Sequence, residues 1–502
     1  MLWCPGAAMA VMAGAVLPAA EVQELVYTTP PANNGAGPLW CYGSTCLVRR
    51  GDEVYIAGLQ TVPERKPLNN VRWVLYHRTP GGWRAVQADP VGLQREPCPL
   101  VVAQDGRLFL STNPTIAPLD AYNGPAAPDV LQFDLADPSR PPVSLAPRFS
   151  EPAPFGEHSY RGFAGDGQSG EIVLFNILGY DRYYWSFRDR QGAWHAGRLD
   201  FPIGTDYEQP VPIRSCYPEI VVKGRAVYLL AISDIIEPVK AWREYKQEIT
   251  GQKWDYDFRR MFYTWTPDIT SQPFRPWLEV ASREQTAGHI TNLDLLVDEQ
   301  GNAHALWREQ SVWNTKLRDK FFPDLKQTQG LYYGIIRDGK LAVKTLLLEG
   351  GEGLVGETPS YGRLHLTPDN RLFAFYWCSG TAADGRTVNE NRLVELLPDG
   401  SAGQTVRVPF EQPFTTFMTA TPRGGSALSH LLDLYGTIAG ADGLWYGRVD
   451  LGCRLAVDFS AALERTSRGA RLLLDGSRSQ SLDGAIASWR WEVAGQTASG
   501  ER

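Results

Sequence analysis

The segment Gly106-Arg-Leu-Phe-Leu-Ser111 places a tight turn directly before a short apolar strand, and the pattern recurs along the chain. Glycine and asparagine favour the left-handed backbone conformation that many tight turns need. Further copies begin at intervals of 54 to 77 residues, at Gly51, Gly170, Gly224, Gly301, Asn370 and, less clearly, Gly425. An interval of that size holds about four short antiparallel strands.

A second strand follows each of the seven turn-and-strand units. These second strands are Trp73–His77, Val130–Phe133, Tyr183–Ser186, Met261–Thr264, Leu331–Gly334, Leu393–Leu396 and Leu444–Gly447. An apolar stretch before each turn and a return strand after each second strand complete a four-stranded unit. One such small sheet cannot bury both faces alone, but sheets packed radially around an axis can. The sequence therefore predicts an all-β, seven-bladed β-propeller. The alternative is a pair of β-sandwiches, which needs no repeat near 60 residues.

The composition agrees with an all-β fold and argues against one class of function. Aromatic residues make up 11% of the 502 residues, with 49 Gly and 36 Pro, and we find few long helical periodicities. The chain has 49 Lys and Arg against 56 Asp and Glu, a net charge of -7. A nucleic-acid-binding protein is expected to carry a broad basic surface instead.

Residues 1–20 contain no charged side chain and end in Pro18-Ala-Ala20 before Glu21. This pattern predicts a signal peptide cleaved near Ala20, and hence a secreted or periplasmic protein. A membrane anchor is the alternative, although its four Gly and Pro residues make a poor spanning helix of barely sufficient length. No other stretch is long enough to cross a bilayer.

Six cysteines remain after the predicted cleavage point, an even number that permits disulfides in an exported chain. Cys41 and Cys453 flank the first and last blades, so a bridge between them that closes the ring is one option. No Cys-x-x-Cys or His-x-x-x-His spacing indicates a metal site. The sequence requires no cofactor and leaves a structural Ca²⁺ ion open.

The character of the sequence changes after Asp450. The segments Leu455–Phe459, Ala470-Arg-Leu-Leu-Leu-Asp-Gly-Ser-Arg-Ser479 and Asp483–Glu492 with its two tryptophans resemble the first half of a polycystic-kidney-disease-type (PKD) immunoglobulin-like module. The predicted domains are thus a signal peptide at 1–20, the propeller at 21–452 and an incomplete PKD-like domain at 453–502. Modules of this kind imply an extracellular polysaccharide setting.

In a propeller, the connections from second to third strands share one face with the approaches to the innermost strands. The third blade has a short connection, and the fourth and fifth have long ones near 233–259 and 308–329. Helical spacing from Val239 to Ile249, closed by Gly251, predicts a helix in the fourth. Trp242 and Trp313 lie on these long connections and are candidate ligand-binding residues beside an axial cleft. Alternatively, the connections only cover blade edges.

Polar and aromatic residues precede the innermost strands of six blades, at points that converge on the axis. Arg can fork onto a carboxylate or sulfate, and Trp and Tyr offer faces to sugar rings. An anionic or polyhydroxylated ligand is therefore predicted, with a structural hydrogen bond as the alternative at each position. The candidates are Tyr42, Arg95, Glu96, His158, Tyr160, Arg214, Tyr217, His289, Asn292, Tyr361 and Arg363.

Glu157-His-Ser-Tyr160, Glu171–Phe175 and Arg182–Trp194, with Glu96–Leu100 and Asp298–His304, resemble exported BNR-repeat propellers. That superfamily includes sialidases and seven-bladed polysaccharide lyases such as ulvan lyases. Full Asp-boxes (Ser-x-Asp-x-Gly-x-x-Trp) and an arginine triad are absent from the sequence, which disfavours a sialidase. A glycoside hydrolase is accordingly less expected than a lyase.

The resemblance places Tyr160 at the catalytic tyrosine of the lyases, with His158 two residues away. A lyase neutralises a uronate carboxylate, removes the C5 proton with a base and protonates the departing oxygen. Where the family has an Arg near the end of the next strand, this chain has Asn176-Ile177. Arg182, Arg214 and Tyr217 complete the candidate catalytic set, and Arg363 is a further candidate for holding the carboxylate.

Two hypotheses from different classes follow. One is a secreted propeller that binds an acidic or polyhydroxylated polysaccharide, or a cell-surface glycan, without strong catalysis. The other is a polysaccharide lyase that cleaves a uronate-containing glycan by β-elimination. Neither requires nucleic acid or a stable membrane span.

Overall fold

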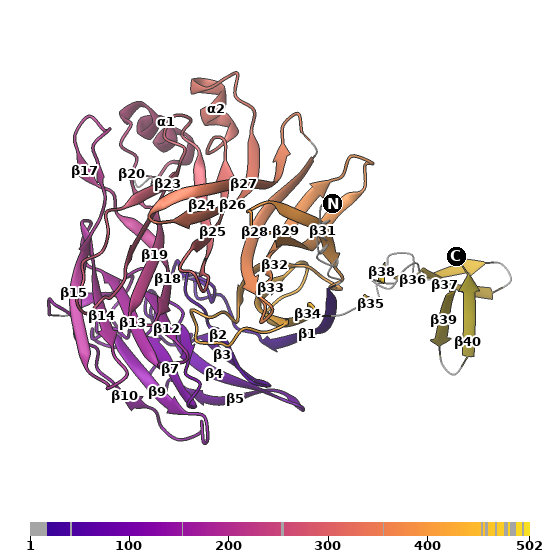
Figure 1. The fold of residues 1–502 in the computed structure, drawn as a ribbon, viewed down its shortest axis with the longest axis horizontal. Coiled ribbons are helices and arrows are strands. Elements are labelled where there is room, and N and C mark those ends of the chain that lie inside the picture. The colour runs from indigo at the N-terminus through magenta and orange to yellow at the C-terminus, as the bar shows by residue number, and fades with distance from the viewer. Residues whose placement is uncertain are drawn as a thin grey trace, which may run out of the picture.

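Seven four-stranded antiparallel sheets form a closed ring in the computed structural model (Figure 1). The structure describes residues 18–40, 43–152, 154–252, 256–354 and 356–452, together with strands between residues 455 and 501. Each innermost strand contacts the innermost strands of the two neighbouring blades, and that of the last blade contacts that of the first. The predicted seven-bladed, all-β propeller is therefore confirmed, and the alternative of paired β-sandwiches is wrong.

The strands of each blade follow one another outward from the axis. Blade 1 contains β2 (Leu47–Arg50), β3 (Glu53–Thr61), β4 (Val71–Thr79) and β5 (Gly82–Ala88); blade 2 contains β6 (Leu100–Val102), β7 (Arg107–Thr112), β9 (Asp129–Asp134) and β10 (Val143–Ser144); blade 3 contains β12 (Gly162–Asp166), β13 (Glu171–Ile177), β14 (Arg182–Arg188) and β15 (Trp194–Asp200).

The next three blades repeat this order. Blade 4 contains β18 (Ser215–Lys223), β19 (Ala226–Ser233), β22 (Arg260–Thr266) and β23 (Leu278–Ser282); blade 5 contains β24 (His289–Val297), β25 (Ala303–Gln310), β26 (Thr328–Arg337) and β27 (Lys340–Gly351); blade 6 contains β28 (Gly356–Leu366), β29 (Leu372–Thr381), β30 (Thr387–Leu396) and β31 (Ala402–Val408).

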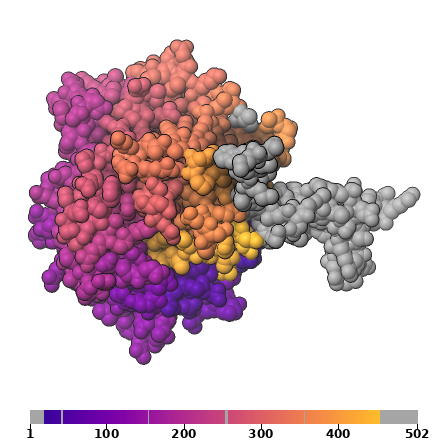
Figure 2. All heavy atoms as spheres, in the orientation of Figure 1, coloured from indigo at the N-terminus to yellow at the C-terminus, as the bar shows by residue number. Residues whose placement is uncertain are grey.

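The last blade is completed by the beginning of the chain. Blade 7 contains β32 (Phe414–Thr419), β33 (Leu431–Ile438) and β34 (Leu444–Asp450), and its outer strand is β1 (Ala19–Tyr27), antiparallel to β34. Figure 2 shows the indigo start of the chain beside the yellow-orange end of the ring. The sequence pattern did not predict this pairing. β1 also extends two residues into the segment predicted as a signal peptide.

Packing between blades explains the apolar second strands that the sequence shows. All seven residues of β13 are buried, because that strand is covered on both faces by its neighbours. In contrast, the outer strand β15 alternates between less and more exposed residues, as expected for a strand with one face in solvent. Gly170, in the turn between β12 and β13, has a φ of 69°, which agrees with the predicted left-handed turn.

The seventh turn-and-strand unit was misplaced by the sequence analysis. Residues 425–430 form no strand, and β33 begins at Leu431. The segment 420–430 instead crosses the end of the central channel: Gly165 N donates to Arg423 O at 2.9 Å, and Val102 N donates to Gly424 O at 2.8 Å. Gly425 has a φ of 78°, and a Cβ there would lie 1.9 Å from the carbonyl oxygen of Val102. This glycine is therefore required for the close approach, not for a strand-initiating turn.

A second segment crosses the channel at its other end, on the way into blade 1. A Cβ on Gly43 would lie 2.4 Å from Pro218 O in blade 4. Ser44 Oγ accepts a hydrogen bond from Phe163 N in blade 3 at 3.0 Å, and Thr45 O accepts one from Leu100 N in blade 2 at 2.8 Å. The two crossing segments tie blades together across the axis.

Two helices and three small strand pairs decorate the connections. α1 (Lys240–Thr250) ends at Gly251 in the left-handed conformation, which confirms the predicted helix. α2 (Thr315–Phe321) begins where the Asn314 side chain accepts a hydrogen bond from Leu317 N. The pairs are β8 (Pro125–Ala126) with β11 (Phe155–Gly156), β16 (Ile203–Gly204) with β17 (Val211–Pro212), and β20 (Ile235–Ile236) with β21 (Tyr256–Asp257).

Three further strand pairs follow the ring. They are β35 (Leu455–Ala456) with β38 (Gln480–Ser481), β36 (Ser460–Thr466) with β37 (Gly469–Asp475), and β39 (Ser488–Val493) with β40 (Gln496–Glu501). The resemblance to a PKD-type module stays a prediction. Cys41 and Cys453 lie outside the described residues, and the described Cys46, Cys98, Cys216 and Cys378 are buried free thiols.

Buried charged side chains from the innermost strands gather at the axis. Asp294 pairs with Arg423 at 2.6 Å and accepts a hydrogen bond from Leu364 N at 2.7 Å. Glu219 is fully buried, and its two carboxylate oxygens accept no hydrogen bond. Burial raises the pKa of Glu219 to about 8, with the charge of Arg423 opposing that rise and the charge of Asp294 adding to it. The folded protein therefore holds this carboxyl protonated at pH 7.

Tyr27→Phe tests the closure of the ring. Leu59 N donates to the Tyr27 hydroxyl at 2.9 Å, and that hydroxyl lies 2.9 Å from the hydroxyl of Tyr435, both buried. Losing the hydroxyl leaves a buried donor without its partner, so we expect the free energy of unfolding to fall by about 1–3 kcal/mol. Urea unfolding measures the change. Tyr122→Phe, on a side chain that is 60% exposed, is the control, and equal effects of the two changes would contradict the prediction.

Glu219→Gln tests the buried carboxyl. Below about pH 4 the folded and unfolded states are both protonated, whereas from there to about pH 8 only the unfolded state loses its proton. The stability of the wild type should therefore fall relative to Glu219→Gln as pH rises through this window, by an amount on the order of a few kcal/mol, and then level off. Chemical denaturation of both proteins at a series of pH values measures this, and a difference that is independent of pH would refute it.

Candidate functional site

Four aromatic rings meet where the chain enters the innermost strands of blades 3 and 4. Ring centroids are separated by 5.5 Å for Trp40–His158, 4.3 Å for His158–Tyr160, 5.2 Å for Tyr160–Tyr217 and 5.6 Å for Trp40–Tyr217. Each of the four residues is partly exposed. The rings form a closed circuit contributed by blades 3 and 4 and the segment before blade 1.

Two more rings extend this circuit toward blade 5. Phe258 lies 6.2 Å from Tyr217, and His289 lies 5.7 Å from Phe258, both partly exposed. We call the six residues the aromatic platform: Trp40, His158, Tyr160, Tyr217, Phe258 and His289. It lies on the face that carries the connections between second and third strands, as the sequence analysis predicted for the converging residues.

The two tyrosines of the platform have an unusual backbone conformation. Tyr160 has a φ of 47° and Tyr217 a φ of 52°, in the left-handed region that costs a bulky residue about 1–3 kcal/mol. At Tyr217 the pairing of β18 with β19 is interrupted by a bulge between Cys216 and Glu219. Both residues hold the same position relative to their strands, which turns the two rings toward each other.

A buried carboxylate orients His158. Its Nδ1 lies 2.6 Å from Glu96 Oε1, and the His158 side chain is 22% exposed whereas that of Glu96 is fully buried. Burial alone would raise the pKa of Glu96, but the hydrogen bond and charge of His158, with the charges of Arg161 and Arg95, hold it below its usual value. An ionised carboxylate only accepts, so Nδ1 carries a proton and Nε2 is left as the second functional nitrogen.

Arg214 lies beneath the platform and is fully occupied. It pairs with Asp234 at 2.9 Å, and its Nε donates to Asp234 O at 2.8 Å. Its guanidinium also lies over the rings of Tyr160, Tyr180 and Tyr256, 5.3, 4.4 and 5.2 Å from their centroids. Burial, and then the negative charge of Asp234, raise the pKa of Tyr160 well above its usual value. Tyr160 therefore remains a neutral phenol.

His289 is also held neutral. Burial lowers its pKa to about 3, with smaller contributions from the positive charges of Arg308 and Lys246. Asn292, on the same strand, donates from Nδ2 to Tyr217 O at 2.8 Å. Asn292 therefore supports the platform through a backbone contact.

The structure brings together Glu96, His158, Tyr160, Arg214, Tyr217 and His289 from the predicted set, but not the others. Arg182 pairs with Asp181 at 2.5 Å and with Asp200 at 3.6 Å, in the outer half of blade 3. Tyr361 and Arg363 are buried in the core between blades 5 and 7, where Arg363 Nη2 donates to the Tyr361 hydroxyl at 2.6 Å. Tyr42 lies outside the described residues.

The tryptophans of the long connections take part in packing. Trp242 contacts Phe322 at 5.6 Å and lies 5.0 Å from the Arg259 guanidinium, and Lys246 Nζ lies 5.2 Å from the Trp313 ring. Arg259 in turn forms two hydrogen bonds to Glu237 at 2.6 and 2.8 Å. These contacts join α1 to α2, in agreement with the alternative that these connections cover the blades.

Sequence reasoning missed Trp40, Phe258 and Asp234. Trp40 stands two residues before Tyr42, so the same approach-to-strand rule could have included it. Phe258 and Asp234 lie at the two ends of the long connection in blade 4, and no local pattern distinguishes them from loop residues. The described residues contain no group of three or more His, Cys, Asp or Glu side chains placed to hold a metal.

Comparison with known proteins adds the fold and no family. No family model and no curated protein sequence matches the chain, so the resemblances to BNR-repeat propellers, ulvan lyases and PKD modules stay predictions. No described helix is long and apolar enough to cross a membrane.

Solved structures with similar folds differ in their activities. An α-L-arabinanase from Penicillium chrysogenum in complex with arabinobiose has a TM-score of 0.40 and 9% identity, covering 86% of this chain and 98% of its own. A GH93 α-L-arabinofuranosidase of Fusarium graminearum has a TM-score of 0.37 and 10% identity, covering 70% and 92%. A Synechocystis apocarotenoid oxygenase has a TM-score of 0.39 and 12% identity, covering 84% and 87%. At these identities the likeness is one of fold alone.

Proposed function

We propose that the aromatic platform binds a polyhydroxylated glycan and that the protein acts as a secreted glycan-binding propeller without strong catalysis. The observation that carries this proposal is the run of six partly exposed rings, drawn from four separate parts of the chain. Sugar rings present C–H groups on one face, and these pack favourably against aromatic faces. The polar edges of His158 and the tyrosines are then available to sugar hydroxyls.

The charges around the platform favour a neutral glycan over an acidic one. Arg214 is paired with Asp234 at 2.9 Å, Arg95 with Glu157 at 3.2 Å and Arg161 with Glu96 at 3.6 Å. A guanidinium engaged by a carboxylate of its own chain offers little charge to a uronate. We therefore keep the polyhydroxylated ligand of the sequence analysis and give less weight to the anionic one.

The state of Tyr160 argues against strong lyase activity. A tyrosine that removes a proton must first lose its own, and a pKa raised above its usual value makes that harder at neutral pH. The extracellular location and the role of residues 453–502 as a PKD-like spacer belong to the same proposal. Both rest on the sequence patterns described above.

Trp40→Ala tests the glycan-binding proposal. Removing the indole breaks the circuit and exposes the edges of its neighbours, so affinity for a neutral glycan should fall about tenfold, the equivalent of about 1.4 kcal/mol. The measurement is calorimetric titration with the best ligand among xylan, laminarin, alginate and polygalacturonate fragments. Trp83→Ala is the control, because Trp83 begins β5 after a hairpin on the opposite face. Equal affinities of the two variants would remove the support for the platform as the binding site.

A second candidate function, β-elimination, is favoured by one observation. Glu96 fixes His158 through Nδ1, which leaves Nε2 as an oriented base beside the neutral phenol of Tyr160. In that reaction Nε2 takes the C5 proton of a uronate, the C4–C5 double bond forms, the C4–O bond breaks, and the Tyr160 hydroxyl protonates the departing oxygen. Glu96, His158 and Tyr160 would then act as one unit.

Incubation with alginate or polygalacturonate separates the two functions. A lyase generates a conjugated uronate whose ultraviolet absorbance rises with time, and His158→Gln should lower that rate by at least about a hundredfold. We expect no such rise from the wild-type protein, since the proposed function is binding. A rise in absorbance that His158→Gln abolishes would establish the lyase in its place.

A further inference from the structure

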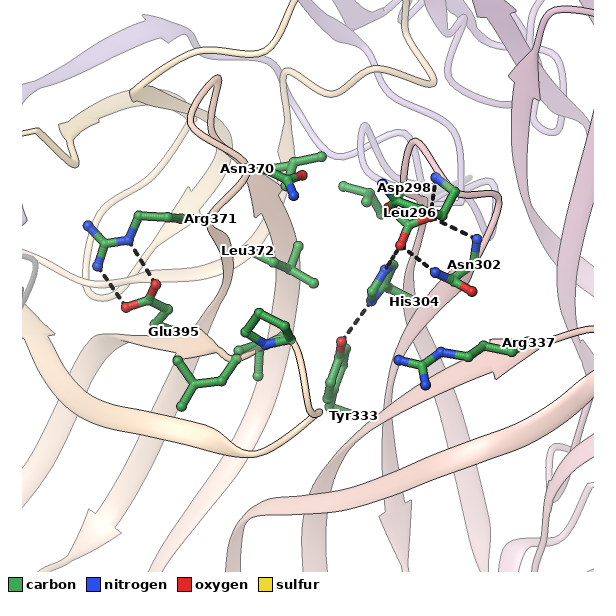
Figure 3. A pocket seen from close by; sticks show the side chains of 15 residues that line it. Leu296, Asp298, Asn302, His304, Tyr333, Arg337, Asn370, Arg371, Leu372 and Glu395 are labelled. Carbon is green, nitrogen blue, oxygen red and sulfur yellow. Dashed lines mark hydrogen bonds and ion pairs between the residues drawn. The ribbon is translucent and has the colours of Figure 1, made fainter. Parts of the chain in front are cut away.

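A pocket of about 490 Å³ lies between blades 5 and 6, at the end of the sheets that carries the turns between first and second strands. The aromatic platform lies at the other end of the sheets. Figure 3 shows that side chains of the two blades face each other across this space. A volume of this size falls in the range of small-molecule sites.

The blade 5 wall of the pocket is polar and internally satisfied. Asp298 Oδ2 lies 3.2 Å from His304 Nε2 and accepts from Asn302 Nδ2 at 2.7 Å, while Oδ1 accepts from the backbone N–H groups of Gln300 and Asn302. His304 Nδ1 lies 2.7 Å from the Tyr333 hydroxyl. Burial alone would raise the pKa of Asp298, but the hydrogen bonds from His304 and Asn302 bring it to about 2. This carboxylate is therefore already saturated with donors and leaves no place for a cation.

The blade 6 wall is aliphatic. It is formed by Leu366, Leu372, Leu396, Leu397 and Pro398, and Leu296 of blade 5 joins it. Arg371 and Glu395 border this wall and neutralise each other through two hydrogen bonds of 2.8 and 2.7 Å. An apolar group in the pocket would thus meet leucine side chains and no unpaired charge on this side.

Arg337 is the exception to this pairing of charges. It is exposed at the end of β26 and lines the pocket, and no carboxylate of the described residues lies within ion-pair distance of it. Figure 3 shows Arg337 at the Tyr333 end of the line formed by Asp298, His304 and Tyr333. Its positive charge also lowers the pKa of Tyr333 against the larger effect of burial, which places the guanidinium near the polar wall.

We propose that this pocket binds an amphipathic carboxylate, with the carboxylate held by Arg337 and an aliphatic chain lying on the leucine wall of blade 6. A guanidinium recognises a carboxylate through two parallel hydrogen bonds. The Tyr333 hydroxyl and the nearby Asn370 and Gln300 side chains can contribute further polar contacts to the ligand. Burying an aliphatic chain of a few carbons against the leucines adds about 0.8 kcal/mol for each CH₂ group.

Titration with three probes tests the charge and the aliphatic part of the ligand separately. Octanoate carries both, acetate carries the charge alone, and octanol carries the chain alone. Saturation-transfer NMR and calorimetry on the full chain should show millimolar or tighter binding of octanoate, with acetate and octanol at least about tenfold weaker. Failure of octanoate to bind at millimolar concentration, or equal binding of either partial probe, would overturn the proposal.

Two variants locate the site. Arg337→Gln should weaken octanoate binding about tenfold, whereas Arg148→Gln, which removes another exposed guanidinium outside the pocket, should leave it unchanged. Leu397→Asp places a negative charge on the half-buried part of the leucine wall and should weaken octanoate binding by at least as much. Thermal melts of each variant establish that the ring is intact. Normal octanoate affinity in Arg337→Gln or in folded Leu397→Asp would refute the assignment.

Discussion

The pairing of β1 with β34 is the constraint on which the rest of the structure depends. Without it the seventh blade would have three strands and an open edge, and the inner strands would lose the circular contact between blades 7 and 1. The aromatic platform draws residues from blades 3, 4 and 5 and from the segment before blade 1, so it exists only while the ring is closed. The pocket between blades 5 and 6 likewise requires two blades held at a fixed angle.

Charge pairing is the second theme of the molecule. Guanidinium groups near the axis and the platform are matched with carboxylates, as in Arg423 with Asp294 and Arg214 with Asp234. Such pairs stabilise little by themselves, but an unpaired partner would be costly in a buried setting. They also remove charge from the face where an acidic ligand was predicted. The contrast makes the exposed and unpaired Arg337 stand out.

The sequence was sufficient for the fold because propeller strands carry a local pattern. A turn residue such as Gly106 or Gly224, followed by a fully apolar strand, is visible without any tertiary information. The closing strand was not visible, because its partner lies more than 400 residues away and nothing local to β1 indicates β34. The segment at Gly425 was misplaced for a related reason: its glycines serve a close contact with blade 2, and their composition resembles that of a turn.

The site was predicted in part for the same reason. Residues at equivalent positions before inner strands, such as His158 and Tyr217, converge wherever the ring closes, so the repeat alone placed them together. Side-chain direction was beyond reach, and Arg182 and Arg363 therefore stand away from the platform even though their positions along the chain were correct. Trp242 and Trp313 pack between two helices that the repeat does not describe.

The order of synthesis gives the closing strand a further consequence. β1 is among the first parts of the chain to be made, yet it stays without its partner until residue 450 has been added. Bringing two such distant segments together carries a loop-closure cost and makes native assembly of the ring a late event. Until then the incomplete ring has free sheet edges at both ends, which is the condition under which β-rich intermediates associate with one another. A chain built in this way gains from being kept extended until its last blade is available.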